Sequence, residues 1–422
     1  MRARTTTLGL VFTAAALLAI RVVAQEPASY SLPPDDVFAG VPKQIDEIQS
    51  SEGINSPELI DPLTNLGLIL REQGDVDLAI AAFERARHVV RVNYGLSSFK
   101  EAPLVRQLVQ IEEARGNAAA AWELEQELLG MIYRSPGPRP GAASMLREIA
   151  DKRLDVLERY SAGEYPPQIK LGCYYGGARV ATPEGIPGSC SSGTSSSVKQ
   201  SLYEETRLYY LDTIDMIRVS EGASAEEIPE LDLSTVRAMY AARNDFTSAR
   251  GGGFSTEGQG RATLRDIHSK LVKYSKPLAD QMHALVDMAD WDLRFAGGRH
   301  EKEAAFQAYE ALYERLQQEG LEQSFIDEIF SPRVPVMLPA FSPNRLVSSE
   351  TPKSSGYIDI AFEITKYGEG KSVEILDATT NATDDARMRL RDLIKRSRFR
   401  PRMADGAFED PSRVVVRYYV ND

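Results

Sequence analysis

The chain has 422 residues, of which 43% are apolar and 26% charged, and its formal net charge is −12. This composition excludes a collagen-like, wholly disordered or membrane-embedded chain, and the length favours two or three domains. The acidic balance argues against nucleic acid as a partner, because nucleic-acid-binding domains are usually basic. With two cysteines and four histidines, the chain lacks the ligands for a cysteine-based zinc scaffold and has little material for histidine chemistry.

Residues 1–24 have the three parts of a signal peptide. A basic start is followed by an uncharged run of thirteen residues, Leu8 to Ile20, and then by small residues before Gln25. The alternative, an uncleaved inner-membrane anchor, needs about 20 apolar residues, and Arg21 interrupts the run. We therefore expect export to the periplasm by a cleavable signal, with membrane contact that is peripheral at most.

Scattered Pro, Gly, Asp and Ser predict an extended leader over residues 25–56. Residues 57–134 then carry apolar and small residues three and four apart, which predicts helices. These residues are Leu63, Leu66, Gly67, Leu70, Ala79, Phe83 and Ala86. Gly74-Asp75 indicates the turn between two helices, and a partial recurrence 42 residues later predicts a second hairpin.

The first of these hairpins resembles a tetratricopeptide repeat in its order of large and small residues. The second copy is degenerate, because Val109 and Glu125 stand where Gly67 and Phe83 would be. The resemblance implies a helical array in which each hairpin covers the apolar face of its neighbour.

Residues 135–200 are predicted to form a helix followed by a loop rich in Gly, Ser and Pro, which contains both Cys173 and Cys190. An exported chain meets an oxidising compartment, which favours a structural disulfide between them. A redox pair is the alternative, but the spacing is not Cys-x-x-Cys.

Residues 201–325 are predicted to form a further helical, repeat-like region. Within it, Trp291 and Tyr309 are expected to pack between the two helices that follow Pro277. Residues 326–356 contain several prolines and are predicted to be a linker.

The hydrophobic period changes to two in residues 357–422, where Ile358, Ile360, Phe362 and Ile364 alternate with other residues. A glycine turn, a second strand, an amphipathic helix after Thr383 and a final strand follow. We expect the helix to cover one face of the sheet. The predicted fold class is therefore multidomain α+β, a helical repeat array followed by a small β-β-α-β domain.

This last segment resembles the TonB C-terminal domain over residues 337–422. The features that carry the resemblance are the strand starting at Gly356, the Gly368–Gly370 hairpin, Arg398-Phe399-Arg400-Pro401 and the Asp405-Gly406 turn. The resemblance implies that the edge of the sheet captures an extended peptide as an added strand.

The candidate edge strand is Arg413, Val414, Val415, Val416, Arg417, Tyr418, Tyr419 and Val420. The alternative is that this strand is interior to the sheet or to a dimer. A candidate basic face consists of Arg387, Arg391, Lys395, Arg398 and Arg402. Such a face suits an acidic protein, anionic lipid headgroups or the acidic helical region, and the alternative is a solvated helix face.

Motifs for catalysis, cofactors or metals are missing from the sequence. Gly251-Gly252-Gly253 lacks the Lys-Ser/Thr of a phosphate-binding loop, and neither His-Glu-x-x-His nor Gly-x-Ser-x-Gly occurs. The sequence predicts a non-enzymatic periplasmic adaptor that uses no cofactor or small-molecule substrate. Its expected partners are proteins such as an outer-membrane transporter or an envelope complex.

Two alternatives remain open. One is a variant TonB-type energy transducer, although the N-terminal apolar run is short and a folded array replaces the proline-rich spacer of that family. The other is an unrecognised enzyme with its site in the Cys173–Cys190 loop.

Overall fold

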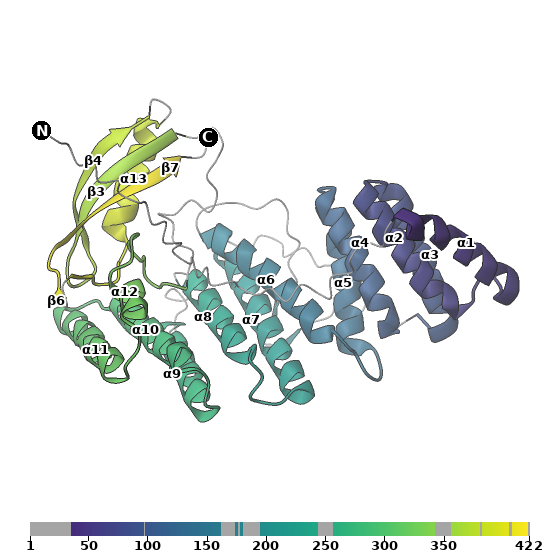
Figure 1. Cartoon of the computed structure of the whole chain (residues 1–422), viewed down its shortest axis with the longest axis horizontal. Helices are drawn as coiled ribbons and strands as arrows, with labels where there is room; N and C mark the ends of the chain where they lie inside the picture. The colour runs from purple at the N-terminus through teal and green to yellow at the C-terminus, as the bar shows by residue number, and fades with distance from the viewer. Residues whose placement is uncertain are drawn as a thin grey trace, which may run out of the picture. The chain divides into compact units, whose positions relative to one another are not determined.

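The computed structural model describes residues 35–96, 98–161, 174–175, 178–179, 195–243, 256–341, 356–379, 382–404 and 407–420. These residues form thirteen α-helices and, near the C-terminus, a small antiparallel sheet, which confirms the α+β class (Figure 1). The chain divides into two compact units, Met1–Arg115 and Gly116–Asp422.

The first unit is helical. Its elements are α1 (Asp35–Glu52), the 3-10 turn η1 (Pro57–Leu59), α2 (Ile60–Gln73), α3 (Val76–Tyr94), the 3-10 turn η2 (Phe99–Glu101) and α4 (Ala102–Ala114). Helices α2 and α3 form the predicted hairpin, with Gly74 in the left-handed region (φ 87°) at the end of α2. A Cβ atom on Gly67 would lie 2.7 Å from the ring of Phe83, so the missing side chain allows the close approach that the sequence predicted.

The expectation of an extended leader over residues 25–56 is wrong for its second half, because α1 occupies Asp35–Glu52. Val41 and Ile45 are buried, and Ile48 is half-buried, so the spacing of four and three forms a helical stripe. Pro42 and the two serines near the end of α1 obscured this periodicity in the sequence.

The second unit begins with a series of helices. They are α5 (Ala118–Arg134), α6 (Ala142–Ser161), α7 (Ser195–Ser220), α8 (Ile228–Ala242), α9 (Thr256–Lys273), α10 (Leu278–Phe295), α11 (Arg299–Gln318) and α12 (Gln323–Phe330). From α6 to α11 each helix packs against the next, as Figure 1 shows. Helix α12 extends into residues 326–356, which were predicted to be a linker.

Trp291 and Tyr309 are both buried, but they do not pack in one layer between α10 and α11 as expected. Trp291 belongs to a core formed with α8 and α9, whereas Tyr309 belongs to a core formed with α12. Helix α10 therefore buries residues on two sides, because it lies between α9 and α11 in the series.

The C-terminal sheet contains β3 (Gly356–Ile364), β4 (Gly370–Ala378) and β7 (Ser412–Val420) in the spatial order β4-β3-β7. Helix α13 (Asp384–Arg396) covers one face, with Leu390 and Ile394 in the same core as the inward residues of β3. Its first turn is capped as predicted, because the Ala386 N–H donates to Thr383 Oγ1 over 3.2 Å.

The C-terminal segment does not pack only against itself. Between α13 and β7 the chain forms the short strands β5 (Met403–Ala404) and β6 (Ala407–Phe408). Met403 and Leu338 are buried in the core of α10, α11 and α12, and the Phe408 ring contacts those of Phe306, Tyr313 and Phe330. The sheet and the last helices therefore share apolar side chains.

Several predictions fall on residues outside the described ranges. They are the signal peptide 1–24, the Cys173–Cys190 disulfide, the Gly251-Gly252-Gly253 loop and the Asp405-Gly406 turn. Among the helices that the structure describes, we find none with the length and apolar character needed to cross a membrane.

Candidate interaction surface

Strand β7 lies at an edge of the three-stranded sheet. It pairs antiparallel with β3 from Gly356↔Val420 to Ile364↔Ser412, without a bulge. Within the described part of the chain, β3 is the only strand that pairs with it. An edge strand presents unpaired N–H and C=O groups that can pair with another chain.

The side chains of β7 alternate between two faces, as the period of two requires. Val414 and Val416 are buried under α13, and Tyr418 packs against the same core. On the other face, Arg413, Val415 and Arg417 are exposed and Tyr419 is half-buried, with 57% of the Val415 surface accessible.

Ion pairs organise the open face beside Val415. Arg417 binds Asp359 of β3 through two hydrogen bonds of 2.7 Å, and its guanidinium lies 4.1 Å from the ring centre of Tyr357. The hydrogen bonds from Arg417 lower the pKa of Asp359. Arg413 lies 3.6 Å from Glu374 of β4. The open face therefore has an apolar centre at Val415 between two arginines.

The five residues of the candidate basic face do not form one surface. Arg391 and Lys395 are exposed on α13, and Arg387 pairs with Asp384 in the first turn. Arg398 lies beyond the helix and binds Glu369, whereas Arg402 donates to the Pro332 carbonyl. Arginine density in the sequence could not separate these roles, because each depends on a distant partner.

Residues 398–400 lie beside the lead-in to the sheet. Met337 and Phe399 form an isolated bridge, with the Leu338 N–H donating to Arg398 O (2.8 Å) and the Arg400 N–H to Val336 O (2.9 Å). The extended backbone makes successive side chains alternate. Phe399 enters the sheet core, while Arg398 and Arg400 point to other partners.

Arg400 binds the helical array through a buried ion pair. Its Nε donates to Asp290 Oδ1 (2.9 Å) and its Nη2 to Asp290 Oδ2 (2.6 Å), while Nη1 donates to the Ile329 carbonyl (3.2 Å). Tyr309 of α11 also donates to Asp290 Oδ1, over 2.7 Å. Burial alone would lower the pKa of Arg400, but the Asp290 carboxylate outweighs it and the pKa is raised.

A second polar group joins the sheet to α11 at the rim of this contact. Glu369 of the β3–β4 turn binds Lys302 (2.8 Å) and Arg398 (2.9 Å), and lies 3.3 Å from Lys371. Hydrogen bonds from Lys302 and Arg398 lower the pKa of Glu369 to about 2. Tyr367 of the same turn donates to Glu303 of α11.

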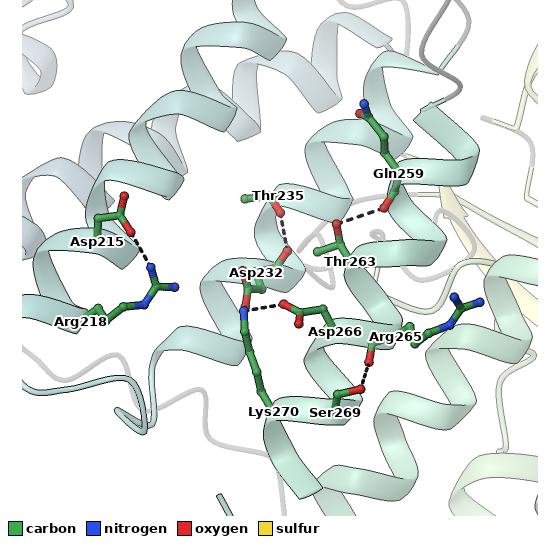
Figure 2. A network of polar contacts seen from close by, with 10 residues as sticks. All are labelled: Asp215, Arg218, Asp232, Thr235, Gln259, Thr263, Arg265, Asp266, Ser269 and Lys270. Atoms are coloured by element: carbon green, nitrogen blue, oxygen red, sulfur yellow. Dashed lines mark hydrogen bonds and ion pairs between the residues drawn. The ribbon is translucent and has the colours of Figure 1, made fainter. Parts of the chain in front are cut away.

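Figure 2 shows a different polar group, which holds α8 to α9. Lys270 donates to Asp232 Oδ2 (2.6 Å) and lies 2.7 Å from Asp266 Oδ2, while Thr235 donates to the Asp232 carbonyl. Burial raises the pKa of Asp232, and the hydrogen bond from Lys270 opposes this shift. One lysine between two carboxylates is a satisfied bridge between helices, so we assign it a structural role.

Among the described residues, no group of three or more His, Cys, Asp or Glu side chains is placed to hold a metal ion. No family model matches the chain, and no curated protein matches it in sequence. The functional argument therefore depends on the geometry of the C-terminal sheet and of its contact with α10–α12.

Proposed function

We propose that the protein is a non-enzymatic adaptor of the periplasm, which binds an extended segment of a partner protein along β7. The observation that carries the proposal is the edge position of β7. An added strand gains backbone hydrogen bonds along the edge, while side-chain contacts determine which segment binds.

The open face of β7 favours a particular kind of segment. Arg413, Val415 and Arg417 would lie beside the added strand, and opposite charges directly across a sheet stabilise the pairing. We expect a segment with an apolar residue opposite Val415 and acidic residues on either side. A second copy with Val415 opposite Val415 is disfavoured, because Arg413 of one copy would then face Arg417 of the other.

The helical series forms the other half of the proposed adaptor. The hairpin-like order of its helices and the Gly67–Phe83 contact support a tetratricopeptide-like array, and the β-β-α-β order supports a TonB-like domain. Such arrays commonly bind protein partners. A partner on the helices and another on β7 would be brought together.

Photocrosslinking in the source cell tests the proposal. A photoreactive amino acid replaces Val415 on β7 and, as a matched exposed control, Val219 at the end of α7, which is 89% accessible. We expect a protein adduct from position 415 only, attached to an extended acidic segment. Adducts to a second copy of the chain, or none from position 415, would reject the proposed partner.

Two additional measurements separate the alternatives. N-terminal sequencing of the exported protein should start at Gln25, and a retained 1–24 segment would instead indicate a membrane anchor. An adduct at position 415 that disappears when the proton-motive force is removed would favour the variant energy transducer over a passive adaptor.

A further inference from the structure

Helix α10 carries a polar stripe on the side that faces the C-terminal segment. His283, Asp287 and Asp290 follow one another at spacings of four and three, which places them on one face of the helix. Asp290 is fully buried and binds Arg400 and Tyr309. Asp287, one turn earlier, is half-buried.

The two carboxylates share one guanidinium. All three nitrogens of Arg400 already donate to Asp290 or to the Ile329 carbonyl. Among the described residues, Asp287 has no hydrogen bond and no ion pair within 4.0 Å. A second negative charge one helical turn from Asp290 is therefore not neutralised by a direct partner.

Groups from three further elements surround this stripe. Tyr309 of α11 donates to Asp290, and Arg400 approaches from the C-terminal segment. Burial and the charge of Asp290 raise the pKa of Asp287 to about 7, and Arg400 opposes this shift. Burial and Arg400 lower the pKa of His283, while Glu328 of α12 and Asp280 of α10 oppose that shift.

We propose that the contact between α10 and the C-terminal segment is a proton-sensitive latch. In the closed contact Asp287 is a neutral carboxylic acid, and Arg400 compensates Asp290 alone. When the contact opens, water reaches Asp287 and its carboxyl group releases one proton to solvent. Opening and proton release are thus linked, and the sheet with its β7 edge is held more tightly in acid.

The direction follows from the two states of Asp287. Its pKa in the closed contact is about 7, above the ordinary value of 3.8. The stabilisation is complete below about 3.8 and is lost as the pH rises through about 7. Between these values the opening constant should rise about tenfold per pH unit. His283 acts in the opposite direction, because its lowered pKa weakens the closed contact as the pH falls.

Hydrogen exchange in the full chain measures the opening. The amide protons of Leu338 and Arg400 cross the contact between the lead-in and residues 398–400, so their exchange reports its opening. Exchange is followed from pH 5 to pH 8 and corrected for intrinsic rates. The proteins compared are the wild type, Asp287→Asn and, as a control, Asp280→Asn, which removes an exposed carboxylate from the same helix.

We expect the opening constant of the wild type and of Asp280→Asn to rise about 100-fold more than that of Asp287→Asn over this range. The same pH dependence in all three proteins would overturn the latch, as would an Asp287→Asn effect of equal size at every pH. If Asp287→Asn does not fold, Asp287→Ser removes the same carboxyl group and should give the same flat response.

Discussion

Two arginine–aspartate pairs in the second unit have nearly the same geometry and opposite surroundings. Arg400 binds Asp290 through two hydrogen bonds of 2.9 and 2.6 Å, and the side chains are 8% and 0% accessible. Arg417 binds Asp359 through two bonds of 2.7 Å, but these side chains are 50% and 20% accessible. Bond length alone therefore says little about what each pair contributes.

Burial decides the difference. Removing one partner of a buried pair leaves a charge without water or a counter-ion, which costs several kcal/mol. Water replaces the lost partner of an exposed pair, so such pairs contribute about 0–1 kcal/mol. The buried pair holds the C-terminal segment on α10, whereas the exposed pair arranges a surface that remains accessible beside β7.

The largest effect is expected for Asp290→Ala. This change leaves Arg400 and the Tyr309 hydroxyl buried without their acceptor, and we expect a loss of about 3–5 kcal/mol in the free energy of unfolding. Chemical denaturation at neutral pH measures it. The matched double variant Asp290→Leu with Arg400→Met removes both charges and should lie much closer to the wild type. A loss below about 1 kcal/mol for Asp290→Ala would contradict the buried charge argument.

A smaller effect is expected for Tyr309→Phe. The ring stays in the core, but Asp290 loses one of its three hydrogen bonds. A hydrogen bond to a charged group is worth about 1.5–3 kcal/mol, which sets the expected loss in denaturation experiments. Tyr313→Phe is the control, because its hydroxyl accepts from Gln317 at an exposed position and should change stability by less than about 0.5 kcal/mol. Equal losses for both variants would show that Asp290 gains nothing special from Tyr309.

The smallest effect is expected for Asp359→Asn. The exposed pair should contribute less than about 1 kcal/mol, and screening by about 1 M salt should remove most of the difference from the wild type. Denaturation at low and high salt measures both quantities. The effect of Asp290→Ala should persist in salt, since buried charges are screened much less. A loss above about 2 kcal/mol for Asp359→Asn would remove the contrast between the two pairs.

Hydrophobic period predicted the elements well where one face of an element is buried. The stripe in Leu63–Phe83, the alternation in Ile358–Ile364 and the cap at Thr383 correspond to observed helices, strand and cap. The helix α1 was missed because Pro42 and polar residues dilute a short apolar stripe. Tryptophan and tyrosine were correctly expected to be buried, but not in which layer, since Trp291 and Tyr309 face different neighbours of α10.

The candidate site was predictable only in part. The sequence named β7 and its residues, but the spatial order β4-β3-β7 is a property of strand pairing. The basic residues after α13 looked alike in sequence, yet Arg398, Arg400 and Arg402 bind Glu369, Asp290 and the Pro332 carbonyl. Nothing in the local pattern around Asp287 or Asp290 marked them as groups of interest.

The sequence by itself determined which segments are helix and which are strand, because backbone preference and the burial of one face act over a few neighbouring residues. Only the tertiary structure decided that Asp290 meets an arginine 110 residues further along the chain, and that Asp287 lies beside them without a partner of its own. The physical reason is that charge pairing in a dry contact depends on packing between distant segments, which local spacing does not encode.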